Sequence, residues 1–127
     1  EKFQTYNLEQ LRTFGENPTV ALVKLRCGEE TLTETATGDG PVDASCVAIE
    51  KIVGYTGKLE QFEIRATTPG KDALGEAHVT VSFDGRSYRG SGASTDIIES
   101  AIHAYLNAVN KHVAYIESKK LNGRAKE

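Results

Sequence analysis

Two stretches of this chain pass from strand-like to helix-like patterning in the same order, and this repetition constrains the fold more than any other feature. Each stretch has three alternating or β-branched segments, followed by apolar residues at helical spacing. The first repeat has expected strands over 3–16, 19–27 and 31–37 and a helix that starts at 41 and ends at Gly54 or Gly57. The second repeat has expected strands over 58–67, 73–83 and 86–92 and a helix over about 96–116. The order predicts an α+β fold of two βββα units, related by a pseudo-two-fold axis, with antiparallel sheets backed by helices.

The alternation is clearest in one strand of each repeat. Ala21, Val23 and Leu25 share a face of the segment 19–27. In the segment 73–83, small and apolar residues occupy every second position, and Asp84-Gly85 after it is a strong hairpin signal. These segments predict half-buried strands that pair with their neighbours along the chain.

A Gly-x-Gly sequence precedes each predicted helix, at Gly38–Gly40 and Gly90–Gly92. When Asp43 is aligned with Asp96, apolar residues occupy matching positions in the two helices. The second repeat then has one extra residue between its Gly-x-Gly sequence and the aspartate. Glycines allow close approach to the backbone, and a helix start offers free N–H groups to a carboxylate. The other interpretation, that these glycines only make the turn, stays open.

Acidic residues lie in the first turn of both predicted helices. Asp96 followed by Glu99 resembles a capping box, with Ser94 as the alternative cap. Asp43 is expected to cap its helix or to stabilise the helix dipole. A contact with the ammonium group of a ligand is the alternative for Asp43 and Asp96.

Composition excludes several classes of protein. A chain of 127 residues with net charge −3 fits one ordinary domain without a broad basic surface for nucleic acid. Its apolar runs are too short to span a membrane. Cys27 and Cys46 have no metal-ligand spacing and read as small core residues of a cytoplasmic protein.

No catalytic constellation is visible. His78 lies on the polar face of its strand, and His103 and His112 lie off the apolar stripe of the last helix. No pair has metal-ligand spacing, and no nucleophile motif frames a serine. A non-catalytic domain is the expected class, without a cofactor of its own.

Small residues on one strand face leave room beside a helix start. Ala66, Ala73, Gly75 and Ala77 form this set. The space would suit a small aliphatic ligand. The alternative is that it only lets a helix pack closely on the sheet.

Several runs of residues resemble the C-terminal regulatory domain of 2-isopropylmalate synthase. They are Gly38-Asp39-Gly40-Pro41-Val42-Asp43-Ala44, Ala73-Leu74-Gly75-Glu76-Ala77, Gly90-x-Gly92 with Ser94 to Ala101, and Ala104 to Asn110. The first run is the most specific, and the resemblance extends from about Phe3 to Ile116. It implies a homodimeric domain that binds leucine and inhibits its own enzyme.

The resemblance also implies the residues that contact leucine. They are Gly38, Gly40, Pro41, Val42, Asp43, Ala66, Ala73, Gly92 and Ala93. The family's catalytic barrel condenses acetyl-CoA with 2-oxoisovalerate and uses a divalent metal. No barrel is present here, and the chain contains no Met, so we expect a fragment of a longer protein.

Two alternatives share this fold. The similar domain of citramalate synthase senses isoleucine, and its pattern has a Trp and an Asn where this chain has no Trp and keeps Asp96. A dimerisation module without a ligand is the other. We expect one domain over 1–118, with repeats at about 3–55 and 57–116, and a flexible basic tail over 119–127.

Overall fold

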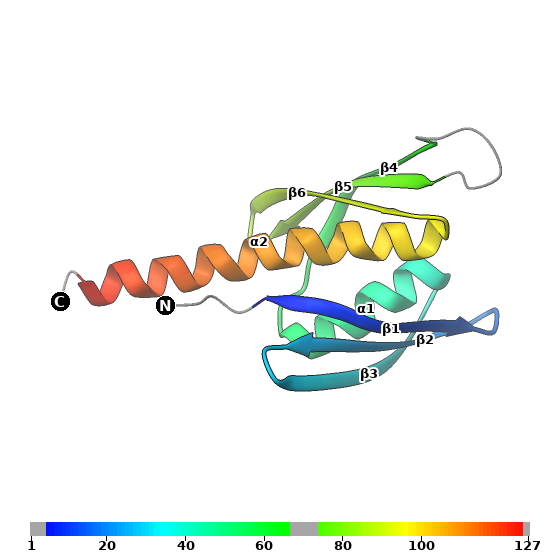
Figure 1. Ribbon diagram of the computed structural model, residues 1–127, viewed down its shortest axis with the longest axis horizontal. Coiled ribbons are helices and arrows are strands. Elements are labelled where there is room, and N and C mark those ends of the chain that lie inside the picture. The colour runs from blue at the N-terminus through cyan, green and yellow to red at the C-terminus, as the bar shows by residue number, and fades with distance from the viewer. Residues whose placement is uncertain (1–4, 67–73, 126–127) are drawn as a thin grey trace.

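The computed structural model describes residues 5–66 and 74–125, and side chains of the last helix as far as residue 122. Six strands and two helices follow one another in the predicted order (Figure 1). The first unit comprises β1 (Tyr6–Phe14), β2 (Thr19–Cys27), β3 (Glu30–Gly38) and α1 (Pro41–Val53). The second comprises β4 (Lys58–Ala66), β5 (Gly75–Phe83), β6 (Arg86–Ser94) and α2 (Ile97–Ala125). The α+β prediction of two βββα units is confirmed.

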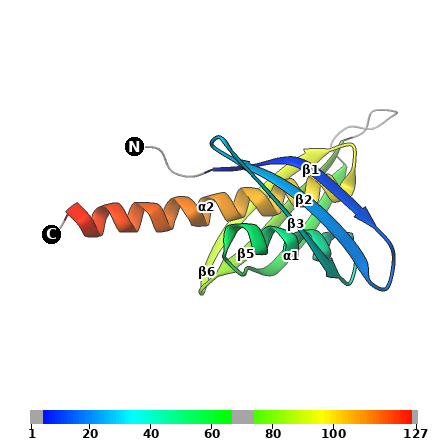
Figure 2. The same cartoon turned by 90° about the horizontal axis from the view of Figure 1, so that it is seen from below.

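The two helices lie between the two sheets (Figures 1 and 2). Each sheet is antiparallel, with orders β1-β2-β3 and β4-β5-β6. Helix α1 packs on β2 and β3, whereas α2 packs on β5 and β6 and also contacts α1 and β1. The alternating apolar faces of β2 and β5 point into this middle layer, where Ala21, Val23, Leu25, Ala77 and Val81 are fully buried.

Residue spacing sets the register of the repeat. Three elements of the first unit begin 56 residues before their counterparts in the second. The pairs of first residues are Thr19 and Gly75 for β2 and β5, Glu30 and Arg86 for β3 and β6, and Pro41 and Ile97 for the two helices. Strands β1 and β4 carry matching bulges near Leu8 and Leu59.

This register corrects the alignment expected from sequence. Asp43 is equivalent to Glu99 rather than to Asp96, and Gly40 is equivalent to Asp96 as the residue before the helix. A shift of three residues keeps a helical position on nearly the same face, and a shift of four keeps a strand residue on the same face. The apolar pattern therefore could not reveal the error.

Helix α2 is buried over a wider arc than one apolar stripe, because it meets both sheets and α1. Its buried residues include Ser100, Leu106 and His112 as well as the stripe. His112 lies off the apolar stripe, as predicted, yet it is buried, with a relative exposure of 2%. The ring stacks on Phe83 with centroids 4.7 Å apart, and Nδ1 lies 2.9 Å from the Tyr88 hydroxyl oxygen.

Burial lowers the pKa of His112, with opposing effects from the charges of Asp84 and Arg86. Its Nε2 atom has no hydrogen-bond partner among the residues that the structure describes. The folded chain thus disfavours the imidazolium, whereas the unfolded chain binds a proton near pH 6.5. We therefore expect the free energy of unfolding to fall as pH drops below 6.5 and to lose this His112 dependence above it.

Urea unfolding at pH 5 to 8 tests this expectation. His112→Phe should flatten the pH dependence between pH 5 and 7, while His103→Gln, at a partly exposed position on the same helix, should keep the wild-type slope. Equal slopes for wild type and His112→Phe would contradict the assignment.

The last helix is longer than the apolar stripe predicts. Residues 119–125, expected as part of a flexible tail, continue α2 as far as Ala125 and extend beyond the sheets (Figure 1). At the base of this extension, the Arg86 guanidinium lies 3.8 Å from the centroid of the Tyr115 ring and donates to its hydroxyl. This contact links α2 to the first residue of β6. Lys119 and Lys120 further along suit the C-terminal end of the helix dipole, which carries a partial negative charge.

Candidate functional site

An apolar groove runs between α1 and β4, with a volume of about 460 Å³. This size falls within the range of small-molecule sites. The groove is lined by Val42, Asp43, Cys46, Val47, Glu50, Thr56, Gly57, Leu59, Phe62 and Tyr105. It therefore joins the start of α1, the edge strand of the second sheet and one side chain of α2.

The apolar face of β4 remains open in this groove. Leu59, Phe62 and Ile64 are 40%, 43% and 38% exposed although they pair with buried residues of β5. The equivalent strand β1 is held to α2, because the Asn110 side chain accepts from the Tyr6 N–H and donates to the Tyr6 carbonyl. The residue equivalent to Asn110 is Gly54, which caps the end of α1 and has no side chain to make such a link. The pseudo-symmetry is thus broken at the groove.

The two helix starts also differ. Asp96 caps α2, since its Oδ1 accepts from the N–H groups of Ile98 and Glu99, and the Ser94 hydroxyl accepts from the Asp96 N–H. Both cap candidates therefore contribute. Helix α1 begins after Gly40, which provides no side-chain cap. The first turn of α1 consequently keeps N–H groups and a positive dipole end for another acceptor.

Asp43 lies in the first turn of α1, and its carboxylate bonds to the segment before the helix rather than to a helix N–H group. Its Oδ2 accepts from the Asp39 N–H at 2.9 Å, which closes the turn into α1. The carboxylate is exposed and also lines the groove. A contact of Asp43 with a ligand ammonium therefore remains a proposal.

A hydrogen-bonded group closes the floor of the groove near the end of α1. Glu50 Oε2 accepts from the Gly57 N–H at 3.0 Å and from the Tyr105 hydroxyl at 3.1 Å. Burial, aided by this bond to Glu50, raises the pKa of Tyr105, so the hydroxyl is a donor at neutral pH. Burial also raises the pKa of the Cys46 thiol to about 12, so Cys46 acts as a neutral small side chain.

The structure gathers only part of the predicted leucine site. Gly38, Gly40, Pro41, Val42 and Asp43 lie together at the start of α1. Ala66 ends β4 opposite Gly75, and Ala73 lies outside the described residues. Gly92 and Ala93 line a separate, more polar hollow between α2, β1 and β6.

Three of the glycines serve helix packing. A Cβ on Gly38 would lie 2.6 Å from the Ala44 nitrogen, and one on Gly92 would lie 2.6 Å from the Ser100 carbonyl oxygen. At Gly90 the distance to the Ala104 carbonyl oxygen is 2.1 Å. A Cβ on Gly40 would meet nothing within 4 Å, although its φ of 157° and ψ of 174° border a region that favours glycine. Of the four glycines in the two Gly-x-Gly sequences, only Gly40 therefore faces open space.

Sequence reasoning missed eight of the ten residues that line the groove. They are Cys46, Val47, Glu50, Thr56, Gly57, Leu59, Phe62 and Tyr105. The available signal was the alternation that places Phe62, Ile64 and Ala66 on one face. It did not show that α1 leaves this face uncovered.

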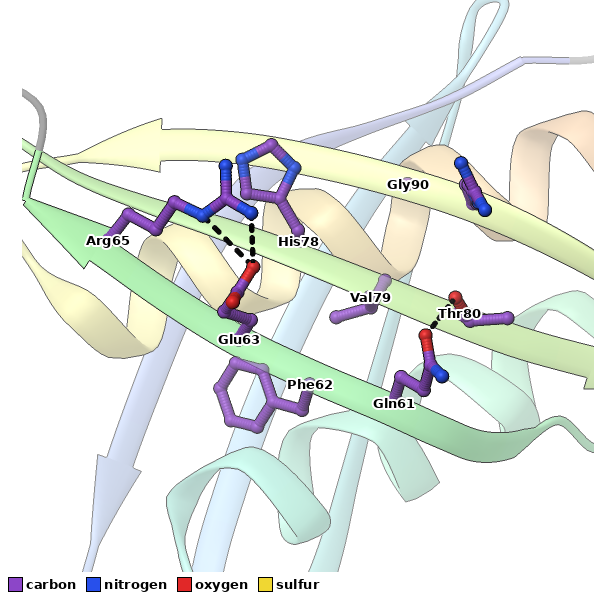
Figure 3. Close-up of a pocket in the computed structure, with 9 residues that line it drawn as sticks. Gln61, Phe62, Glu63, Arg65, His78, Val79, Thr80 and Gly90 are labelled. Carbon is purple, nitrogen blue, oxygen red and sulfur yellow. Dashed lines mark hydrogen bonds and ion pairs between the residues drawn. The ribbon is translucent and has the colours of Figure 1, made fainter.

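A second hollow lies on the outer face of the sheet formed by β4, β5 and β6 (Figure 3). Arg65 pairs with Glu63 at 2.7 Å and His78 pairs with Glu76, while Arg89 also lines this hollow. The Thr80 hydroxyl donates to Gln61 at 3.4 Å. This hollow is lined mainly by polar and charged side chains, unlike the α1/β4 groove.

Within the described part of the chain, no group of three or more His, Cys, Asp or Glu side chains could hold a metal ion. No helix there is long and apolar enough to cross a membrane.

The fold defines an α+β module of two βββα units, and comparison with known proteins gives its family. The family profile described as the LeuA allosteric (dimerisation) domain matches residues 1–113. The chain belongs to this family.

Its relatives are 2-isopropylmalate synthases. The protein of Methylacidiphilum infernorum is 47% identical over 112 residues, which are 85% of this chain and 22% of the relative. The protein of Ruminiclostridium cellulolyticum is 44% identical over 107 residues, which are 84% of this chain and 21% of the relative. The protein of Rhodopirellula baltica is 47% identical over 108 residues, which are 84% of this chain and 20% of the relative. The chain therefore spans about a fifth of the length of these curated relatives.

Proposed function

We propose that this domain binds leucine in the α1/β4 groove and thereby gives feedback inhibition of a 2-isopropylmalate synthase. The observation that carries the proposal is the combination of an uncapped helix start with an open apolar strand face in one groove. An aliphatic amino acid has both matching parts: a carboxylate and an apolar side chain.

The groove offers a partner for each part of leucine. The N–H groups of the first turn of α1 would receive the carboxylate, helped by the helix dipole. Asp43 would face the ammonium group. Val47, Leu59 and Phe62 would cover the aliphatic side chain, which loses its contact with water.

Gly92 and Ala93 are left out of this site. Gly92 lies beneath α2, and both residues line the other hollow. Gly38 acts indirectly, because its missing Cβ lets the strand approach the first turn of α1.

The regulatory setting is also proposed. A homodimer follows from the family's description as a dimerisation domain. We infer that the parent protein is a cytoplasmic 2-isopropylmalate synthase that condenses acetyl-CoA with 2-oxoisovalerate, and the name of the relatives supports this inference. The divalent metal of that reaction would belong to the catalytic part. The same names favour leucine over the isoleucine sensed by citramalate synthase.

Thermal unfolding separates this function from a dimerisation module that binds no ligand. A ligand that binds only the folded state stabilises it by about 2.7 kcal/mol at 100 times its Kd. We expect leucine to raise the melting temperature of the chain in a concentration-dependent manner, and glycine at equal concentration to leave it unchanged. A melting temperature insensitive to millimolar leucine, at constant protein concentration, would support the dimerisation module instead.

A further inference from the structure

We propose that Glu50 determines the specificity of the α1/β4 groove by limiting the length of the aliphatic side chain that it accepts. This inference rests on the proposed function, because it concerns the amino acid bound there. It assigns a role to a residue that neither the sequence patterns nor the resemblance singled out.

Glu50 lies on the same face of α1 as Asp43, two helical turns further along. Seven residues of α-helix rise about 10 Å along the axis. Both carboxylates line the groove, and Val47, Leu59 and Phe62 line the space with them. The apolar part of the groove therefore has a polar boundary at each end.

The carboxylate of Glu50 is held in place. Its Oε2 accepts from the Gly57 N–H and from the hydroxyl of Tyr105, a side chain only 2% exposed. Two donors from different elements fix the rotamer, so the side chain cannot swing aside at low cost. The polar end of the groove is thus a fixed boundary.

The length between the boundaries suits leucine. Four carbon–carbon bonds separate its carboxylate carbon from a δ-methyl, which is about 5 Å. A carboxylate hydrogen bond adds about 3 Å at the start of α1, and a van der Waals contact about 4 Å at the other end. Together these lengths come to about 12 Å, which is comparable to the rise of about 10 Å along α1 between Asp43 and Glu50.

Norleucine is the informative competitor because it has the same atoms as leucine in an unbranched chain that is one bond longer. Its terminal methyl would reach the Glu50 carboxylate and displace water from it. A carboxylate that loses hydration without gaining a partner is unfavourable. The groove should therefore prefer leucine to norleucine.

Calorimetric titration of this 127-residue chain with both amino acids tests the role of Glu50. We expect wild type to bind leucine more tightly, by about tenfold, as is usual for a difference of one methylene position. Glu50→Ala should remove most of this preference by strengthening norleucine binding. Glu50→Gln keeps an acceptor for Gly57 and Tyr105 but removes the charge, so it should change the preference in the same direction by a smaller factor.

Glu29→Ala, in the exposed turn between β2 and β3, is the matched control and should keep the wild-type preference. Thermal unfolding establishes that each variant is folded, and Glu50→Gln decides the test if Glu50→Ala is not. The inference is overturned if wild type binds leucine and the folded Glu50 variants keep its preference. If wild type binds neither amino acid, it is the proposed function that fails.

Discussion

Replacing Gly90 with alanine is expected to lower the free energy of unfolding by about 3 kcal/mol, at the upper end of overpacking effects. The new Cβ would lie 2.1 Å from the Ala104 carbonyl oxygen and 3.0 Å from the Ala108 nitrogen. Both atoms belong to the backbone of α2, so the whole helix must move away from β6. Urea or thermal unfolding at fixed protein concentration measures the loss, with about 4 °C expected per kcal/mol.

Gly28→Ala provides the control for a general effect of replacing glycine. Gly28 has a φ of 64°, and a Cβ there meets nothing within 4 Å. Only the backbone conformation is then penalised, by about 1 kcal/mol. Equal losses for the two variants would show that helix packing at Gly90 is not the constraint.

Gly40→Val is expected to abolish saturable leucine binding at millimolar concentration and to leave the domain folded. The isopropyl group would stand at the uncapped start of α1, where the ligand carboxylate must approach. No protein atom lies within 4 Å of the added Cβ, so the stability cost comes from the backbone conformation and is about 1–2 kcal/mol. Calorimetry and thermal unfolding on the same sample separate the two effects.

Gly54→Val tests the same substitution at the other end of α1. Gly54 caps the C-terminus of the helix with a φ of 82° and also faces open space. The Gly54→Val variant should lose at least as much stability as Gly40→Val, and its affinity for leucine should stay near that of wild type. If Gly40→Val bound leucine as well as Gly54→Val, the start of α1 would not be the carboxylate site.

The fold could be predicted from sequence because its signals are local. Alternation marked β2 and β5, Asp84-Gly85 marked a hairpin, and helical spacing began at Pro41. The register of the repeat could not be predicted in the same way. Shifts of three residues in a helix and four in a strand preserve the buried face, so Asp43 and Asp96 were aligned although they are not equivalent.

The site depended on contacts between distant segments. The start of α1 was found from its glycines and Asp43. Leu59 and Phe62 of β4 stay partly exposed beside the start of α1, because α1 does not cover this face of the strand. The burial of His112 could not be predicted for a related reason, since a helix between two sheets is buried on more than one side.

The central claim is that the α1/β4 groove binds leucine, and titration of wild-type chain with leucine in a calorimeter tests it most directly. Saturable binding, with weaker binding of isoleucine, is the predicted result. The two ligands differ in the position of one methyl group, which is worth about 1–3 kcal/mol in a shaped pocket. Absence of binding heat with leucine at millimolar concentration, at two temperatures, would contradict the claim.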